Sequence, residues 1–315
     1  MTPLAPVVSI VVPCFNEEDA LPQTSERVLA ALEALIADGI AAADSAIHFV
    51  DDGSTDRTWA VIAGLSAATA RIRGIKLSRN YGHQHALLAG LLTVPGDALI
   101  TIDADLQDDV NAMREMVTAH AAGAEIVYGV RRARPADSWF KRFSGESYYR
   151  VADAMGVRLV FNHADYRLLS RRAVETLRQY EERNVFLRGI VPQLGFTSAL
   201  VYYDRRERVA GESKYPIRKM LAFAFEGITS FSAVPLKLIT LIGLAVSLAS
   251  FATVLWALWV KLVTHDALPG WTSTVVPVSL LGGIQLLCTG VIGQYLAKIY
   301  IETKARPRFT IDKTT

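Results

Sequence analysis

The sequence predicts an α/β domain with a mostly parallel sheet, followed by a C-terminal hairpin of two membrane-spanning helices. In the first 130 residues, short apolar runs alternate with stretches of helical apolar spacing. This alternation is typical of parallel strands joined by right-handed crossover helices. Residues 236–260 and 275–297 are almost free of charge, and each is long enough to cross a bilayer, which takes about 20 residues.

Each predicted element has its own local signal. Five short apolar runs are expected as strands: residues 7–12, 47–50, 72–77, 98–102 and 126–130. Apolar residues at helical spacing predict helices over about 21–35, 59–65, 87–92, 110–120 and 172–180. An apolar segment at 185–194 and a strand over 197–203 follow. Asn16 is the expected N-cap of the first helix, and Ser54 or Thr55 that of the second.

The composition of the 315-residue chain agrees with a soluble domain joined to a membrane anchor. Hydrophobic residues make up 51% of the chain, and the mean hydropathy of +0.25 is high for a purely soluble protein. The net charge of +2 does not suggest a nucleic-acid partner. Cys14 and Cys288 fall in the domain and in the second span, so no structural disulfide is expected. Pro6 and Pro13 flank the first apolar run, which we interpret as a strand and not a signal peptide.

Asp103 and Asp105 directly follow the fourth predicted strand. Residues two apart on an extended segment point the same way, so both carboxylates can face one point beyond the strand. Two hard oxygen ligands suit Mg²⁺ or Mn²⁺, which also take water and phosphate oxygens. A solvated acidic turn is the simpler explanation, but ligand sites in open α/β sheets lie at this position.

Two other strand ends carry polar pairs, Asn16 with Glu17 and Asp51 with Asp52. Strand ends of a parallel sheet converge on one edge, so three polar sets there favour a site over isolated helix caps. The first strand-to-helix turn has no Gly-x-Gly-x-x-Gly, which weakens a dehydrogenase interpretation. The basic segment that begins at Arg131 is either a solvated loop or an anion clamp, since Arg forks match phosphate oxygens.

The distribution of Lys and Arg around the two spans predicts their orientation. Both residue types lie before the first span and after the second, and residues 264–274 contain neither. The positive-inside rule then places the domain and both termini in the cytoplasm. Helices over 143–155 and 214–232 are expected at the membrane surface. Three tryptophans would form the outer aromatic belt: Trp256, Trp259 and Trp271. Four glycines of the second span permit close helix packing, including packing between subunits: Gly282, Gly283, Gly290 and Gly293.

Four motifs in this order resemble the family 2 glycosyltransferases of GT-A fold, a Rossmann-like α/β fold: residues 12–17, 50–56, 103–108 and 205–215. More narrowly, the chain is similar to bacterial polyprenyl-phosphate glycosyltransferases related to dolichyl-phosphate mannose synthase. The resemblance spans nearly the whole chain and implies a GT-A domain over 1–213, an interfacial helix over 214–232 and a hairpin over 233–315. One departure is Asp109-Val110, where the family often has prolines. We expect it to alter the helix start more than the chemistry.

The resemblance implies site residues position by position. The nucleotide pocket would be lined by Pro13, Phe15, Asn16 and Glu17, with Asp51 on the base and Asp52 supporting the loop. The metal and the donor diphosphate would be held by Asp103, Asp105 and Gln107, with Ala104 in the donor site. Phosphate groups of the donor or the lipid would be held by Arg131, Arg205, Arg208, Ser213 and Lys214. The implied catalytic set is Asp105, Asp165 and Arg208, with Asp165 the family's usual candidate for the base.

The implied activity is the inverting, metal-dependent transfer of one sugar from a nucleotide sugar to polyprenyl phosphate at the inner membrane of a bacterium. UDP-glucose and undecaprenyl phosphate are the substrates that the resemblance favours. A phosphate monoester has a second pKa of about 6, so the acceptor needs little help to lose a proton. Asp165 is therefore expected to orient the acceptor or to stabilise an oxocarbenium-like centre.

Two alternatives remain open at this point. A processive polysaccharide synthase shares the acidic motifs, but it would carry more spans and a Gln-x-x-Arg-Trp motif. Here no Trp follows Arg205 or Arg208. A non-catalytic membrane scaffold or translocase subunit would not need the acidic pair Asp103 and Asp105. The expected partners are a nucleotide sugar, a polyprenyl phosphate, the membrane and a further copy of the chain, with no nucleic acid.

Overall fold

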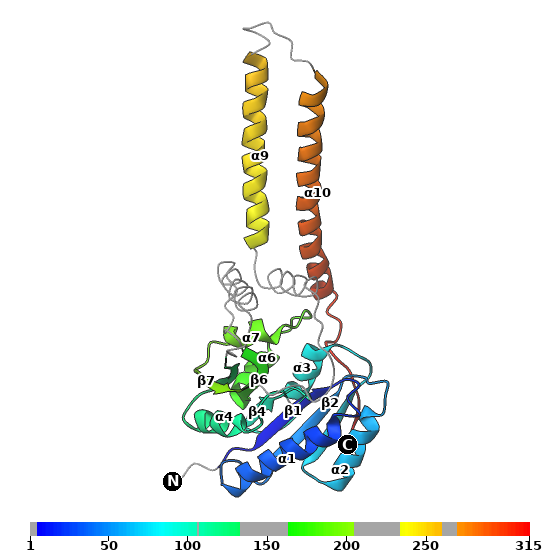
Figure 1. Cartoon of the computed structure of the whole chain (residues 1–315), viewed down its shortest axis with the longest axis vertical. Helices are drawn as coiled ribbons and strands as arrows, with labels where there is room; N and C mark the ends of the chain where they lie inside the picture. Colours follow the sequence, from blue (N-terminus) through cyan, green and yellow to red (C-terminus); the bar gives the residue numbers. More distant parts are fainter. Residues whose placement is uncertain (1–4, 106, 133–162, 205–233, 260–269) are drawn as a thin grey trace. The chain divides into compact units, whose positions relative to one another are not determined.

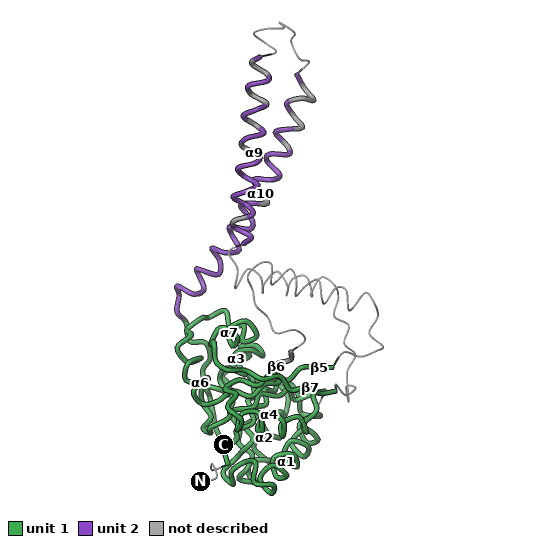
Figure 2. The backbone as a smooth tube through the Cα atoms, turned by 90° about the vertical axis from the view of Figure 1, so that its left-hand side faces the viewer, with its two compact units in different colours: residues 1–150, 158–216, 306–315 green, residues 151–157, 217–305 purple. Residues whose placement is uncertain are grey.

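The computed structural model describes residues 5–105, 107–132, 163–204, 234–259 and 270–315. The chain forms two compact units (Figure 2), one of residues 1–150, 158–216 and 306–315 and one of residues 151–157 and 217–305. The predicted surface helices at 143–155 and 214–232 lie outside the described residues, as does the motif at 205–215.

The first unit contains an eight-stranded sheet in the order β7-β5-β6-β4-β1-β2-β3-β8. Five of these strands, β7, β6, β4, β1 and β2, are labelled in Figure 1. The strands are β1 Val8–Cys14, β2 Ala46–Asp51, β3 Ile72–Leu77, β4 Ala98–Thr101, β5 Ile126–Arg131, β6 His163–Ser170, β7 Ser198–Tyr203 and β8 Ile311–Thr314. Strands β4, β1, β2 and β3 are parallel neighbours, which confirms the predicted α/β class. The sheet is mixed, because β6 runs antiparallel to β4 and β5, and β8 runs antiparallel to β3.

The described residues of this unit form six helices beside the sheet: α1 Leu21–Ala37, α2 Thr58–Ala68, α3 His83–Thr93, α4 Ala112–Ala121, α6 Arg171–Arg178 and α7 Leu187–Gln193. Successive residues of a strand face opposite sides, and the two sides of β1 have different partners. Its residues Val8, Ile10 and Val12 join the core cluster to which α1, α2 and α4 contribute. On the other side, Gly90 of α3 packs against Val11, where an added Cβ would lie 2.3 Å from a Val11 methyl carbon.

Two predicted helix caps are wrong. Helix α1 begins at Leu21, and Asn16 has a φ of 54° in the preceding turn, where it does not cap the helix. Helix α2 begins at Thr58, whose N–H donates to a carboxylate oxygen of Asp56 at 2.9 Å. The polar side chains of Asn16 and Ser54 join the two turns to each other.

The second unit contains two long helices, α9 Val234–Trp259 and α10 Gly270–Thr303. Many of their described apolar side chains are exposed, including Leu244, Phe251, Leu286 and Ile299. Among the described residues, one segment, Leu280–Thr303, passes the length and hydropathy criteria for a membrane span. Helix α10 begins at Gly270, so the predicted loop at 264–274 is helical in its last residues.

Candidate active site

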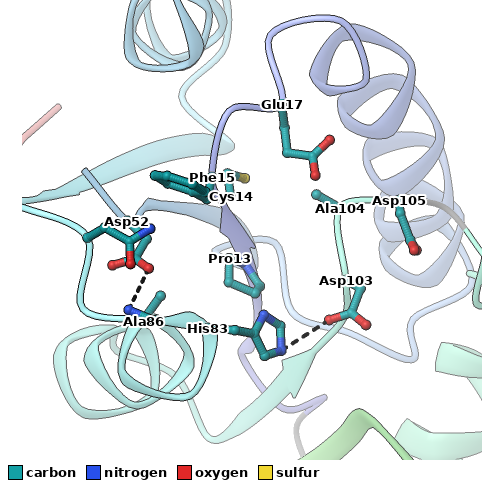
Figure 3. Close-up of a pocket in the computed structure, with 12 residues that line it drawn as sticks. Pro13, Cys14, Phe15, Glu17, Asp52, His83, Ala86, Asp103, Ala104 and Asp105 are labelled. Carbon is teal, nitrogen blue, oxygen red and sulfur yellow. Dashed lines mark hydrogen bonds and ion pairs between the residues drawn. The ribbon is translucent and has the colours of Figure 1, made fainter. Parts of the chain in front are cut away.

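A cavity of about 390 Å³ opens where β1, β2 and β4 end, which is the edge that the sequence predicts for a site (Figure 3). Its size falls in the range of small-molecule pockets, roughly 300–1,000 Å³. The lining residues are Pro13, Cys14, Phe15, Glu17, Asp52, Asn80, Gly82, His83, Ala86, Asp103, Ala104 and Asp105.

The predicted site residues divide into three groups. Seven of them line the cavity: Pro13, Phe15, Glu17, Asp52, Asp103, Ala104 and Asp105. Five others lie in the described part of the chain but are not among the lining residues: Asn16, Asp51, Gln107, Arg131 and Asp165. The remaining four lie outside the described residues: Arg205, Arg208, Ser213 and Lys214.

Asn16 fastens the β1–α1 turn to the β2–α2 turn. Its backbone N–H donates to the Ser54 hydroxyl at 3.0 Å, and its side-chain oxygen accepts from the Thr55 N–H at 2.9 Å. The next residue, Glu17, donates its N–H to the Thr58 hydroxyl at 2.9 Å. This bracing fixes the turn that presents Phe15, which lines the cavity with 44% of its surface exposed. An exposed aromatic ring in a polar cavity can stack on another planar ring.

The adjacent carboxylates Asp51 and Asp52 have different surroundings. Asp51 is fully buried and accepts a hydrogen bond from the Ser54 N–H at 2.9 Å. Asp52 lines the cavity and accepts from the backbone N–H groups of Tyr81 and Gly82, at 2.7 and 2.9 Å. The structure therefore places Asp52 at the cavity and Asp51 beneath it, whereas the resemblance implies the base contact for Asp51.

Asp103 carries a buried oxygen, Oδ1, that accepts no hydrogen bond from the described residues. Nε2 of His83 lies 3.5 Å from this oxygen (Figure 3). Burial raises the pKa of Asp103 to about 6; His83 opposes this rise, and the carboxylates of Asp165, Asp108 and Asp105 add to it. Asp103 is thus a carboxylate whose negative charge is incompletely balanced within the protein.

These features fit a divalent cation supplied with a phosphate ligand. Within the described ranges, no group of three or more His, Cys, Asp or Glu residues is arranged to hold a metal ion. Asp103 and Asp105 both line the cavity, so the chain offers two carboxylates and leaves the other ligand positions open. Mg²⁺ is usually held by one or two carboxylates, with water and substrate phosphates completing its shell. Gln107, the third implied ligand, is buried and donates its N–H to Asp105 at 3.2 Å.

Asp165 is enclosed by donors. Its two oxygens accept from Arg167, from Arg188 at 3.1 and 3.2 Å, and from Gln84 at 3.2 Å, while His83 lies 3.5 Å away. Arg167 is itself buried and also donates to the Leu187 carbonyl. Burial favours a raised pKa for Asp165, but the His83 hydrogen bond and the two arginines outweigh it and hold the pKa well below the usual range. A carboxylate so stabilised is a weak proton acceptor.

Arg131 is engaged within the protein. Its guanidinium donates to Asp108 at 3.0 and 3.2 Å and to the Tyr203 hydroxyl at 3.3 Å. Tyr203 also donates to the same Asp108 oxygen at 2.6 Å, and its ring meets Tyr166 edge-on at 5.3 Å. Arg131, at the end of β5, thus links this strand to Asp108 in the segment after β4.

The sequence reasoning missed five lining residues: Cys14, Asn80, Gly82, His83 and Ala86. Four of them belong to the loop after β3 and the start of α3. The rule that selected the other strand ends applies to this one too, because β3 runs parallel to β2 and ends at the same edge. The turn after β3 carries no carboxylate, so its residue types give no sign of a site.

The cavity, with the acidic turn after β4 in its lining, lies at the carboxyl edge of the parallel strands, where open α/β sheets bind ligands. Residues 9–178 match Glycosyl transferase family 2, and the chain belongs to this family. It is therefore a glycosyltransferase, as the sequence motifs predict, and the resemblance to family 2 is confirmed.

Relatives of the chain match it over almost its whole length. The uncharacterized glycosyltransferase YkoT of Bacillus subtilis (strain 168) is 48% identical over 309 residues, covering 98% of this chain and 91% of that protein. The bactoprenol glucosyl transferase of Shigella phage SfX is 38% identical over 305 residues, covering 96% and 98%. Among solved structures, the mannosyltransferase PcManGT from Pyrobaculum calidifontis, in complex with GDP-Man and Mn²⁺, aligns with a TM-score of 0.47 at 16% identity, covering 94% and 85%.

Proposed function

We propose that the protein transfers one glucose from UDP-glucose to the phosphate of bactoprenol, the undecaprenyl phosphate carrier, at the cytosolic face of a bacterial inner membrane. The observation that carries the proposal is the similarity to bactoprenol glucosyl transferases over 96–98% of both chains, which includes the two long helices. The cavity beside an acidic turn gives this activity a place for a phosphorylated donor.

In this proposal the donor lies across the cavity from Phe15 to the acidic turn. The ring of Phe15 stacks on the uracil, and Asp103 and Asp105 are the residues that would hold Mg²⁺ or Mn²⁺. When bound, the cation supplies positive charge to the diphosphate that leaves. Arg205, Arg208, Ser213 and Lys214 are proposed to hold the diphosphate or the lipid phosphate.

The chemical step needs no strong base. An acceptor phosphate oxygen attacks the anomeric carbon, the bond from that carbon to the diphosphate oxygen breaks, and the configuration inverts. The acceptor is largely ionised at neutral pH, since a phosphate monoester has a second pKa of about 6. Asp165 is surrounded by Arg167, Arg188 and His83, so we assign it to positioning and to balancing charge around the anomeric centre.

The membrane part of the proposal assigns α9 and α10 to a hairpin with both ends of the chain in the cytoplasm. The apolar side chains exposed along both helices support this assignment, because such surfaces are suited to lipid. The segment 214–232 is proposed to lie in the interface, where it would bring the lipid head group to the domain.

The test uses membranes from cells that produce the full chain, with radiolabelled UDP-glucose, undecaprenyl phosphate and Mg²⁺ or Mn²⁺. We expect one glucose per lipid, and at least about a hundredfold less transfer for Asp105→Asn. Asp38→Asn is the matched control, since Asp38 is an exposed acid that pairs with Arg114 on the surface. A polymeric product, or no transfer with any nucleotide sugar, would contradict the proposal.

A further inference from the structure

Strand β8, which the sequence reasoning did not predict, follows α10 and completes the sheet beside β3. The segment 306–315, which contains this strand, belongs to the same compact unit as the cavity. Thr315 holds β3 twice, because its N–H donates to the Gly74 carbonyl at 3.1 Å and its hydroxyl accepts from the Gly74 N–H at 2.8 Å. The same hydroxyl lies 2.9 Å from the Ser66 hydroxyl, which ties the strand to α2. Arg308 adds a hydrogen bond to the Tyr180 carbonyl.

The loop of residues 78–82, between β3 and α3, forms one wall of the cavity through Asn80 and Gly82. On the cavity side it is held by Asp52, which accepts from two of its backbone N–H groups. Gly53 packs directly against it, since a Cβ added at Gly53 would lie 2.3 Å from the carbonyl carbon of Arg79. One side of this loop is therefore fixed by the β2–α2 turn.

The other side of the 78–82 loop is fixed by the segment around β8. The Ser78 N–H donates to the Thr310 carbonyl at 2.9 Å, at the point where β3 gives way to the loop. The Ser78 hydroxyl in turn lies 3.1 Å from the Tyr81 hydroxyl, and the Arg79 guanidinium covers the Tyr81 ring at 3.9 Å. Hydrogen bonds from Ser78 and Thr310 lower the pKa of the Tyr81 hydroxyl, which agrees with a polar contact between the loop and this segment.

We propose that residues 310–315 are a positioning element for the donor pocket, because they hold the 78–82 loop against Asp52 and so keep Asn80 and Gly82 at the cavity wall. The proposal rests on the proposed function in one respect, namely that the cavity binds the nucleotide sugar. Only a few residues separate the end of α10 at Thr303 from β8, so the chain that leaves the proposed membrane helix is the chain that braces the pocket.

Without residues 310–315, the backbone groups of Gly74 and Ser78 would lose the partners described above. A backbone hydrogen bond contributes about 1 kcal/mol net, so losing the contact nearest the loop corresponds to about a fivefold change in an equilibrium. Because Asn80 and Gly82 touch the donor cavity, we expect this change in donor affinity. The chemical step and the lipid affinity depend on other residues and should change little.

The first experiment deletes residues 310–315 from the full-length protein. We expect KM for the donor to rise about fivefold, with kcat and KM for the lipid within about twofold of wild type. Hydrogen exchange measured by mass spectrometry should become faster in peptides that cover residues 74–82 and stay unchanged in peptides that cover α4. A synthetic peptide of residues 306–315 should restore the donor KM of the deletion variant.

A milder pair of variants covers the case in which the deletion variant does not fold. Thr315→Val removes the hydroxyl that Gly74 and Ser66 use, and it should raise the donor KM in the same direction by a smaller factor. Thr314→Val makes the same change at an exposed neighbour and should leave the donor KM unchanged.

An unchanged donor KM in the deletion variant would overturn the proposal. So would equal losses in kcat and in both KM values that the peptide does not rescue, because that result describes a merely structural strand. If the wild-type protein transfers no sugar, the proposed function fails, and the exchange rates of residues 74–82 still test whether β8 holds the loop.

Discussion

Two carboxylates, the half-buried Asp103 and the buried Asp165, each have an oxygen 3.5 Å from Nε2 of His83, and they have opposite surroundings. Asp103 keeps an oxygen that accepts no hydrogen bond from the described residues, and its pKa is raised to about 6. Asp165 is surrounded by two arginines, a glutamine and His83, and its pKa is held well below the usual range. Burial raises the pKa of both groups and His83 lowers it in both, so the difference comes from Arg167 and Arg188, which lower the pKa of Asp165, and from the neighbouring carboxylates, which raise that of Asp103. Pairs of acids with separated pKa values commonly have different roles, and here one is suited to a cation and the other to fixed positioning.

The comparison predicts its largest effect at Asp103. Asp103→Asn removes one of the two carboxylates that are assigned to the cation, so transfer should fall at least about a hundredfold. The melting temperature without divalent cation should stay equal or rise, because the repulsion among neighbouring acids is relieved. Steady-state kinetics over a Mn²⁺ titration and thermal melting measure both quantities. Asp109→Asn is the control, and a wild-type response to Mn²⁺ in Asp103→Asn would remove Asp103 from the proposed metal site.

For Asp165 we expect the opposite: a large effect on stability and a smaller effect on transfer. Asp165→Asn leaves the buried Arg167 without its anionic partner, and breaking a buried ion pair costs about 3–5 kcal/mol. We therefore expect a clear drop in melting temperature, with transfer reduced about tenfold and still measurable above pH 7. Complete loss of transfer in a variant that remains folded would favour the role of catalytic base.

A smaller effect is expected at the far end of the cavity. Phe15→Leu keeps an apolar side chain but removes the aromatic face, which is worth about 0.5–1.5 kcal/mol in a stacked pair. KM for the donor should rise about fivefold while kcat stays near the wild-type value. Competition with free UDP isolates the nucleotide contact, and an unchanged inhibition constant for UDP would show that the base lies elsewhere.

His48 offers a reference outside the cavity, with no expected effect on transfer at pH 7. Burial, aided by the charge of Arg73, lowers its pKa to about 4 from an ordinary value of 6.5. As the pH falls, His48 therefore takes up a proton in the unfolded chain at a higher pH than it does in the folded protein. Its contribution to stability is complete above about pH 6.5 and is lost as the pH falls toward 4. The slope is about 1.4 kcal/mol per pH unit in that window. Melting at pH 7 and pH 5 should show a smaller difference for His48→Gln than for wild type.

The sequence predicts the parallel half of the sheet well, because β1, β2 and β4 are buried along their whole length and are mostly apolar, and β3 keeps buried apolar residues at Ile72, Ile75 and Leu77. It does not predict β6, because that strand carries Asp165 and Arg167, which are buried as charged partners and interrupt the apolar pattern. Nor does it predict β8, a strand of four residues at the sheet edge with three exposed side chains. Strands of this kind are specified by their neighbours and not by their own composition.

The acidic part of the cavity was predictable, since Asp103 and Asp105 directly follow a buried strand. The loop at Asn80, Gly82 and His83 was overlooked, because amide, glycine and histidine residues are common in ordinary turns. The different positions of Asp51 and Asp52 could not be read from the sequence either. Two adjacent residues at a strand end point to opposite sides, and only the register of β2 decides which one reaches the cavity.

Gly53 sets a limit on redesign of this pocket. Its φ of +67° and its close approach to the backbone of Arg79 mean that any side chain at this position would push the neighbouring wall out of place. An engineer who wishes to change the sugar nucleotide accepted by the protein should therefore leave this glycine alone. Ala86 and Phe15, which also line the cavity, are the better starting points for a library.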